Sequence, residues 1–275
     1  MGGAFSCSVH THSSLCDGKD SLERMAEAAF AAGVEYFGFS GHIHTPILHD
    51  EGNVLPAGAE GYMELCRGLK ERYAGKMDIL LGIEWDSCSN ETPPEGLDYW
   101  IASVHNLRGE NGKYYSIDWQ REIFAACRDE VFGGDVYAMI SSYYTEVAAA
   151  ASMKPTILGH IDLITKLNGD GSLFDEESAE YRSAALKALS FVDPESTLLE
   201  INTGAVARGY RSEPYPARFI LEKWRSMGGK VIITSDAHRA EDIVFGYQEA
   251  LEWAKSAGFT GCALLSPEGI RTAGI

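Results

Sequence analysis

The chain has 275 residues, 45% hydrophobic and 23% charged, a composition typical of a folded protein with a sizeable core. Its 40 acidic residues outnumber its 23 basic residues, and the net charge of −17 makes nucleic acid and anionic membrane surfaces unfavourable partners. Six cysteines without CxxC spacing, no bilayer-length apolar segment and no secretory leader predict a cytoplasmic protein with reduced thiols.

Short β-rich runs recur along the chain, and each is followed by a polar loop and a helical pattern. We predict seven strands, at Ala4–Val9, Val34–Phe39, Met77–Ile83, Tyr99–Val104, Thr156–Leu158, Thr197–Ile201 and Lys230–Thr234. This alternation is typical of parallel strands connected by helices, and no linker or repeat interrupts it. The sequence therefore predicts one domain, residues 1–275, folded as a closed or nearly closed seven-stranded β/α barrel.

The helices between the strands follow from apolar spacing and capping residues. Asp20–Ala32 keeps a helical period, with Asp20 and Glu23 as a predicted capping box and Gly33 as its end. The same reasoning predicts helices at Ala59–Tyr73, from Pro216 in a first turn to Gly228, and at about Ala240–Ala257.

The connection between the fourth and fifth strands is longer than the others. It contains two predicted helices, Trp119–Val131 and Asp135–Ser152. We interpret residues 107–152 as a helical insertion that forms a lid or rim.

The histidines are concentrated at the ends of the predicted strands. Of eight histidines, all but His49 lie at or just past the carboxyl end of a strand: His10, His12, His42, His44, His105, His160 and His238. In a barrel these ends meet on one face, where catalytic residues are found. A single histidine at a strand end is more often a hydrogen-bonded structural residue, so the joint pattern is what indicates a metal cluster.

Carboxylates accompany these histidines. Glu84 follows the third strand, Asp236 follows the seventh, and Asp17 lies in the first loop. Histidine and carboxylate together suit zinc, iron or manganese, and the lack of a cysteine cluster argues against a structural zinc of the finger type. The sequence contains no GxSxG elbow, no phosphate loop ending in GK[ST] and no GxGxxG after a strand, so serine hydrolases, P-loop enzymes and dehydrogenases lose support.

The ordered motifs HTH, SGH, GIEWD, SVHN, GHID and SDAH resemble the PHP superfamily from residue 10 to about residue 240. The runs EINTGAVARGYRSEPYP and ITSDAHRAEDI resemble its histidinol-phosphate phosphatase branch. The resemblance implies a distorted seven-stranded β/α barrel that holds two or three divalent metal ions.

The resemblance also implies which residues hold each ion. The first would be bound by His10, His12, Glu84 and Asp236, the second by Glu84, His105 and His160, and the third by Asp17, His42 and His238. Many relatives carry a histidine in a C-x-H-G type sequence where this chain has Cys16, Asp17 and Gly18. Aspartate can bind the same ion, but the change affects the metal preference of the third position.

The chemistry implied is hydrolysis of a small phosphomonoester. Paired metals lower the pKa of a bridging water, so that hydroxide can attack phosphorus near neutral pH. Asp236 or His238 would protonate the leaving oxygen, and Trp85, Asp86 and Asp162 would orient ligand imidazoles. For substrate binding the candidates are Arg208, Arg211, Arg239 and His44, with Lys166 as a weaker one.

These residues lead us to expect a histidinol-phosphatase of histidine biosynthesis. The alternatives are a PHP phosphoesterase for a nucleotide or another monoester, and a non-catalytic metal-binding PHP module. The sequence gives no oligomeric state and does not identify the residues that contact the imidazole and the amine of the substrate. The insertion at 107–152 could supply them.

Overall fold

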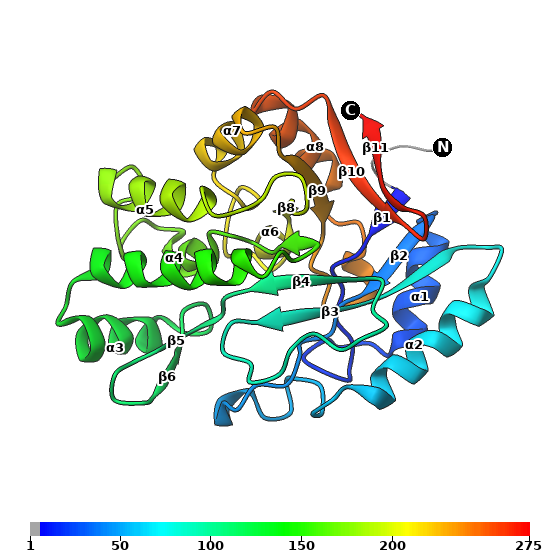
Figure 1. The fold of residues 1–275 in the computed structure, drawn as a ribbon, viewed down its shortest axis with the longest axis horizontal. Helices are drawn as coiled ribbons and strands as arrows, with labels where there is room; N and C mark the ends of the chain where they lie inside the picture. The colour runs from blue at the N-terminus through cyan, green and yellow to red at the C-terminus, as the bar shows by residue number, and fades with distance from the viewer. Residues whose placement is uncertain (1–5) are drawn as a thin grey trace.

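Parallel strands run through the centre of the molecule in chain order, and helices cover their outer side (Figure 1). The structure is a computed structural model that describes residues 6–275. The barrel strands are β1 (Cys7–Ser8), β2 (Tyr36–Phe39), β3 (Asp78–Asp86), β4 (Tyr99–Ser103), β7 (Ile157–Leu158), β8 (Leu198–Asn202) and β9 (Lys230–Thr234). Each matches one predicted strand, although the first two residues of the strand predicted at Ala4–Val9 lie outside the described residues.

The first and last of these strands meet just beyond their carboxyl ends. Thr11 and Ala237 form a parallel bridge, in which His12 N donates to Ala237 O at 2.9 Å and Ala237 N donates to His10 O at 3.1 Å. The expected barrel-like α/β fold is confirmed, and this contact brings the HTH and SDAH motifs side by side.

The sheet contains two strands that the sequence analysis missed. β10 (Gly261–Ser266) runs parallel to β9, and β11 (Gly269–Gly274) pairs antiparallel with β10, so the sheet has nine strands within the described residues. The predicted count of seven was wrong for the sheet as a whole. Five of the six β11 residues are exposed, and such an edge strand carries little of the apolar pattern used for prediction.

A tyrosine fills the interior below the histidines. The Tyr99 hydroxyl donates to the carbonyls of Val9 and Phe39 at 2.5 and 3.0 Å. A Cβ on Gly82 would lie 2.3 Å from the Tyr99 ring, and one on Gly38 would lie 2.3 Å from its hydroxyl. Glycine at both positions therefore allows one large side chain to pack between three strands.

The helices agree with the prediction in position but differ at several ends. They are α1 (Leu22–Ala31), α2 (Glu60–Tyr73), α3 (Arg121–Phe132), α4 (Val136–Ser152), α5 (Ala179–Leu189), α6 (Gly204–Ala207), α7 (Arg218–Ser226) and α8 (Tyr247–Ser256), with 3₁₀ helices η2 (Leu48–Asp50), η3 (Leu163–Asn168) and η4 (Ala240–Asp242). Helices α5 and α6 were not predicted.

Three predicted helix starts were wrong. Ser21 caps α1 and accepts from Arg24 N, whereas the side chain of Asp20 accepts from Ala240 N. Pro216 precedes Ala217, the N-cap of α7, and so lies outside its first turn. The last predicted helix is divided because Gly246, with φ of 70°, starts α8 after η4.

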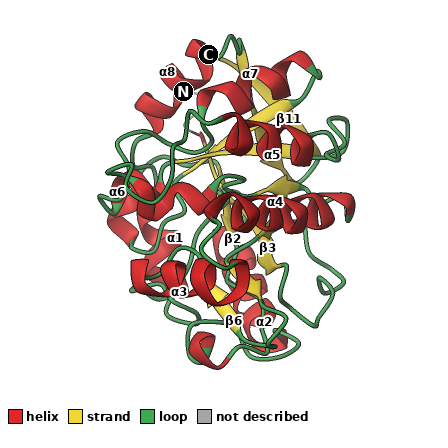
Figure 2. Ribbon diagram, turned by 90° about the vertical axis from the view of Figure 1, so that its left-hand side faces the viewer, coloured by secondary structure: helices red, strands yellow, loops and turns green. Residues whose placement is uncertain are grey.

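The insertion forms one side of the molecule. It contains a short hairpin, β5 (Asn106–Arg108) and β6 (Tyr114–Ser116), followed by α3 and α4. Figure 2 shows α3, α4 and α5 next to one another on the same side of the sheet. All six cysteines are free thiols, as expected. Between residues 6 and 275, no helix is both long enough and apolar enough to cross a bilayer.

Candidate metal centre

The predicted metal ligands gather at the carboxyl ends of the barrel strands. They form four overlapping groups whose ligand atoms lie within 4.8 Å of one another: His12, Asp17, His42 and His238; His10, His160 and Asp236; His10, His12 and Glu84; and His42, Glu84 and His105. Every residue proposed as a ligand from the sequence is present in these groups. The remaining strand-end histidine, His44, is not.

Glu84 lies at the middle of this cluster and is only 1% exposed. Its Oε2 is 3.2 Å from His10 Nε2, 3.4 Å from His12 Nε2 and 3.0 Å from His42 Nδ1. Its Oε1 is 3.0 Å from His160 Nε2 and 3.4 Å from His105 Nε2. The two oxygens therefore face two different sets of imidazoles, which is the arrangement expected of a carboxylate that bridges two ions.

Backbone pairing explains how these residues meet. His42 and Glu84 form a parallel bridge past the end of β2, and Ile43 N donates to Glu84 O at 2.9 Å. The bridge between Thr11 and Ala237 likewise brings His10 and His12 next to Asp236 and His238. The cluster is thus a consequence of sheet register at the barrel mouth.

Several buried atoms in the cluster have no hydrogen-bond partner in the part of the chain that the structure describes, among them His10 Nε2, His12 Nε2, Asp17 Oδ1 and Glu84 Oε2. Buried polar atoms are normally satisfied, so these atoms indicate a missing partner. Imidazole nitrogens and carboxylate oxygens at this spacing suit divalent metal ions. The residues present therefore fit the metals that the resemblance implies.

Hydrogen bonds to the far side of two imidazoles hold them in a ligating orientation. His10 Nδ1 lies 2.5 Å from Glu200 Oε1, and His105 Nδ1 lies 2.8 Å from Asp86 Oδ2. When Nδ1–H donates to a carboxylate, the lone pair of Nε2 is free for a metal. Asp86 has the orienting position predicted for it.

Glu200 was missed by the sequence analysis. It is fully buried on β8, where its Oε1 accepts from Thr234 Oγ1 at 2.7 Å and its Oε2 accepts from His160 N at 2.7 Å. The Glu200 carboxylate thus contacts two predicted metal ligands, His10 and His160. The available signal was a single acid inside the apolar run TLLEIN, because a fully buried glutamate is rare unless it is paired.

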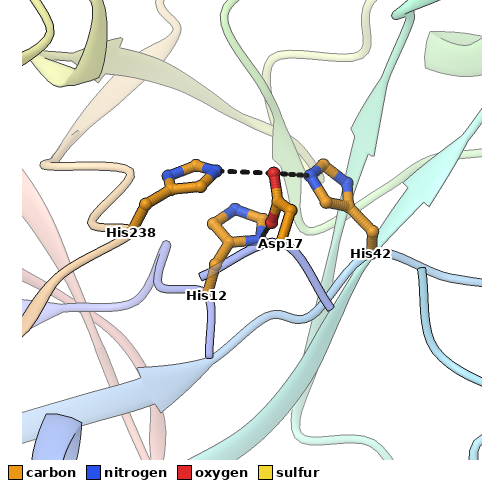
Figure 3. A group of neighbouring side chains, drawn as sticks. All are labelled: His12, Asp17, His42 and His238. Atoms are coloured by element: carbon orange, nitrogen blue, oxygen red, sulfur yellow. Dashed lines mark hydrogen bonds and ion pairs between the residues drawn. The ribbon is translucent and has the colours of Figure 1, made fainter. Parts of the chain in front are cut away.

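Asp17 occupies the space between three imidazoles (Figure 3). Its Oδ2 is 3.0 Å from His238 Nε2 and 3.6 Å from His42 Nε2, and its Oδ1 is 3.4 Å from His12 Nδ1. Burial would raise the pKa of Asp17, but His42 and His238 hold it well below its ordinary value. An ionised aspartate is therefore available at the position where the resemblance led us to expect a histidine.

The protonation of the ligand histidines differs from one to the next. Burial, together with His238 and His42, lowers the pKa of His12 to about 3, so this imidazole is neutral. Burial opposes the charge of His42 as well, yet Glu84 and Asp17 raise its pKa to about 9. Glu200 and Glu84 similarly raise the pKa of His10 above its usual range despite burial.

Metal binding should therefore release protons. His10 and His42 are protonated near neutral pH without metal, and a metal can bind only the neutral imidazole. Because both pKa values are raised, metal affinity should increase as pH rises towards about 9, the pKa of His42. Calorimetric titration of the metal-free protein with Zn²⁺, in buffers of different ionisation enthalpy, measures the release. An affinity that is independent of pH and buffer would contradict the protonation states.

A cavity of about 390 Å³ opens above the cluster. Arg208 lines it, and its guanidinium donates to Asp236 O at 3.0 Å and to Asp236 Oδ2 at 2.9 Å. Arg208 Nη1 also lies 3.0 Å from His238 Nδ1. These contacts still leave N–H groups for a ligand, because a guanidinium has five donors. Gly204 permits this packing, since a Cβ there would lie 2.7 Å from Asp236 Oδ2 and 2.9 Å from Arg208 Nη2.

Asp236 has a strained backbone, with φ of 48°, which is uncommon for a residue other than glycine. Burial would raise the pKa of its carboxyl, but Arg208 and His10 hold it well below its ordinary value. Nδ1 of His238 lies 2.9 Å from the Asp236 carbonyl, which directs Nε2 towards Asp17.

Of the other candidates for substrate binding, two line the cavity and two do not. Arg239 lines the cavity, and so does Lys166, whose ammonium pairs with Asp118 at 2.7 Å. The structure puts Arg211 outside the cavity, where it forms two hydrogen bonds with Glu176 at 2.7 and 2.8 Å. His44 also lies outside, 3.6 Å from Glu91. The loop after β8 turns Arg211 towards η3, whose Thr165 carbonyl it contacts.

Two predicted orienting residues have other partners. Trp85 Nε1 donates to Glu91 O at 2.8 Å. Asp162 Oδ2 accepts from Ala217 N at 2.7 Å, and no hydrogen bond joins Asp162 to the His160 ring among the described residues. Adjacency in sequence to a ligand was therefore a poor guide for these two positions.

Comparison with known proteins places the chain among related sequences. The PHP domain family matches residues 6–204. The chain is 27% identical over 270 residues to histidinol-phosphatase from Bacillus subtilis (strain 168), covering 88% of this chain and 97% of that protein. It is 20% identical over 235 residues to histidinol-phosphatase from Saccharomyces cerevisiae, covering 72% of this chain and 68% of that protein.

The fold is also similar to a solved structure. Histidinol phosphate phosphatase from Lactococcus lactis, complexed with zinc, L-histidinol and phosphate, gives a TM-score of 0.63 at 19% identity, covering 96% of this chain and 98% of that chain.

Proposed function

The chain belongs to the PHP domain family, and on that premise we propose that it is a metal-dependent phosphomonoesterase that hydrolyses L-histidinol phosphate to L-histidinol and phosphate. The observation that carries this proposal is Glu84, whose two oxygens face separate sets of imidazoles at the floor of a cavity lined by Arg208. A cluster built only to store metal would not need a phosphate-binding arginine beside it.

When bound, the divalent metals supply a nucleophile near neutral pH and neutralise charge on the phosphoryl oxygens. Arg208 binds the phosphate through the N–H groups that Asp236 leaves free, as its planar guanidinium suits. The low pKa of Asp236 makes its carboxylate an acceptor, not a proton donor. Of the two candidates for protonating the leaving oxygen, this leaves His238, which lines the same cavity.

The relatives support the choice of substrate. Two proteins that match this chain over most of its length are histidinol-phosphatases, and the similar Lactococcus lactis structure contains L-histidinol, phosphate and zinc. This substrate would place the enzyme in histidine biosynthesis. We also propose that the reaction takes place in the cytoplasm, because all six thiols are unpaired, as is usual in a reducing compartment.

A panel of phosphomonoesters tests the proposal. Phosphate release should be fastest with histidinol phosphate, slower with ethanolamine phosphate and a nucleoside monophosphate, and abolished by a chelator. If a nucleotide were the best substrate, the chain would be a PHP phosphoesterase of another specificity. If no ester were cleaved by protein shown to contain metal, the enzyme proposal would fail.

We further propose that Trp119 contacts the imidazole of the substrate. Trp119 lies in the insertion, lines the cavity and is 55% exposed. The imidazole of His49 already stacks on its ring, with centroids 6.1 Å apart and planes 23° from parallel. His49 is in turn held by Asn106, 3.0 Å away, so the indole has a fixed neighbour on one side. A planar ring at this rim suits an aromatic leaving group.

Trp119→Leu should raise KM for histidinol phosphate by about tenfold, because stacking contributes on the order of 1 kcal/mol beyond burial. KM for ethanolamine phosphate, which has no ring, should stay nearly constant. Trp119→Phe, which keeps a ring, serves as the matched control and should recover most of the loss. Equal losses on both substrates would show that Trp119 supports the rim without contacting the leaving group.

A further inference from the structure

A second cavity, of about 350 Å³, lies behind the metal centre. Its lining includes Asp162, Tyr215, Tyr181 on α5, Phe219 on α7 and Trp253 on α8. Of residues 6–275, none lines both this cavity and the one above the metal cluster. Its volume falls within the range of small-molecule sites in proteins.

Two residues that line this cavity have a buried polar atom with no hydrogen-bond partner among residues 6–275, namely Asp162 Oδ1 and Tyr215 OH. Asp162 is 2% exposed, Tyr215 is 3% exposed and Tyr181 is fully buried. The other carboxylate oxygen of Asp162 is already used by Ala217 N. An unsatisfied buried carboxylate oxygen is costly, so these atoms point to a ligand with hydrogen-bond donors.

The charges around the cavity indicate the class of that ligand. Its three arginines each pair with a glutamate, as Arg211 with Glu176, Arg182 with Glu177 and Arg218 with Glu222. Asp162 and Glu213 line the cavity without an ion pair among residues 6–275. Two carboxyl groups are therefore left without an arginine partner, and both can accept hydrogen bonds from an organic cation.

The aromatic lining favours an organic cation over a metal ion. Tyr181, Tyr215, Phe219 and Trp253 all border the cavity, and aromatic faces attract organic cations. The guanidinium of Arg182 already lies 4.7 Å from the centre of the Phe219 ring. An alkylammonium or imidazolium group could donate to Asp162 Oδ1 and rest against these rings.

The cavity is next to a predicted metal ligand. The rings of Tyr215 and His160 have their centroids 6.4 Å apart, and Asp162 follows His160 by two residues. A ligand held by Asp162 and Tyr215 would thus touch the side chain that packs against His160. We propose that this cavity is a regulatory site for a small organic cation bound by Asp162, and that its occupancy changes the turnover number.

Fluorine NMR of the metal-loaded protein labelled with 5-fluorotryptophan tests binding without any activity assay. The chain has five tryptophans, of which Trp253 lines this cavity and Trp119 lines the other. Propylammonium should shift the Trp253 signal saturably, whereas propanol, which has the same heavy-atom count but no charge, should not. The half-saturation found by NMR should match that of the change in kcat on histidinol phosphate.

Two variants assign the site. Tyr215→Phe removes only the hydroxyl, and Asp162→Asn keeps an oxygen for Ala217; each should weaken propylammonium binding, the latter by about tenfold. Glu249→Gln, at an exposed carboxylate on α8 that lines neither cavity, is the matched control and should bind normally. The proposal is overturned if Trp253 does not respond saturably, if Asp162→Asn binds as the wild type does, or if binding leaves kcat unchanged. These NMR outcomes hold even if histidinol phosphate is not the substrate.

Discussion

Glu84→Gln should lower kcat by about a thousandfold or more and reduce the number of bound metal ions, because a bridging carboxylate supplies several kcal/mol to a metal site. Glutamine has the same shape, but it lacks the negative charge that Glu84 places among the five surrounding imidazoles. Burial would raise the pKa of Glu84, yet His10 and His42 hold it well below its ordinary value, so the wild-type group is ionised at any physiological pH. The variant thus removes a full charge from the centre of the cluster.

Metal analysis and kcat should be measured on the same preparation of this variant. Glu64→Gln, on the exposed side of α2, is the matched control and should keep both values. Circular dichroism separates loss of metal from loss of fold. Wild-type metal content with kcat reduced less than tenfold would show that Glu84 is not a bridging ligand.

The position of the metal centre could be predicted because parallel strands impose it. Once His10, His42, His105 and His160 were assigned to strand ends, the barrel left them only one face to occupy. The assignment did not require knowing the register of the sheet. Predicting the contacts of Glu84 would have required the register of the sheet, because the bridge between His42 and Glu84 determines which imidazoles face each carboxylate oxygen.

The residues that support the ligands were less predictable. Glu200 lies forty positions after His160 in the chain, and only the pairing of β7 with β8 brings them together. Arg208 and Arg211 are three residues apart in one loop, yet one lines the metal cavity and the other pairs with Glu176. Side-chain direction in an irregular loop depends on tertiary contacts, which local sequence patterns do not contain.

Arg208→Ala should lower kcat/KM by about a hundredfold or more, the usual cost of losing one donor to developing charge. An arginine that only bound the phosphate would mainly affect KM, because it would act on the substrate. The structure adds a second role, since Arg208 also donates to the backbone and carboxylate of Asp236. Removing it frees a buried, ionised carboxylate at a strained residue, so kcat should fall together with the rise in KM.

Two further variants separate these roles. Arg208→Lys keeps a positive charge near Asp236 but loses the planar fork, so kcat should recover more than KM does. Arg211→Ala changes the same loop outside the metal cavity, and its effect on kcat/KM, measured without added cations, should be at least tenfold smaller. If Arg211→Ala instead caused the same loss as Arg208→Ala, the phosphate would be bound by Arg211. The loop would then have to rearrange so that Arg211 leaves Glu176 and enters the metal cavity. The metal content of all three variants should be measured and should equal that of the wild type. Changes in kcat and KM can then be attributed to the substituted arginine and not to loss of metal from the cluster.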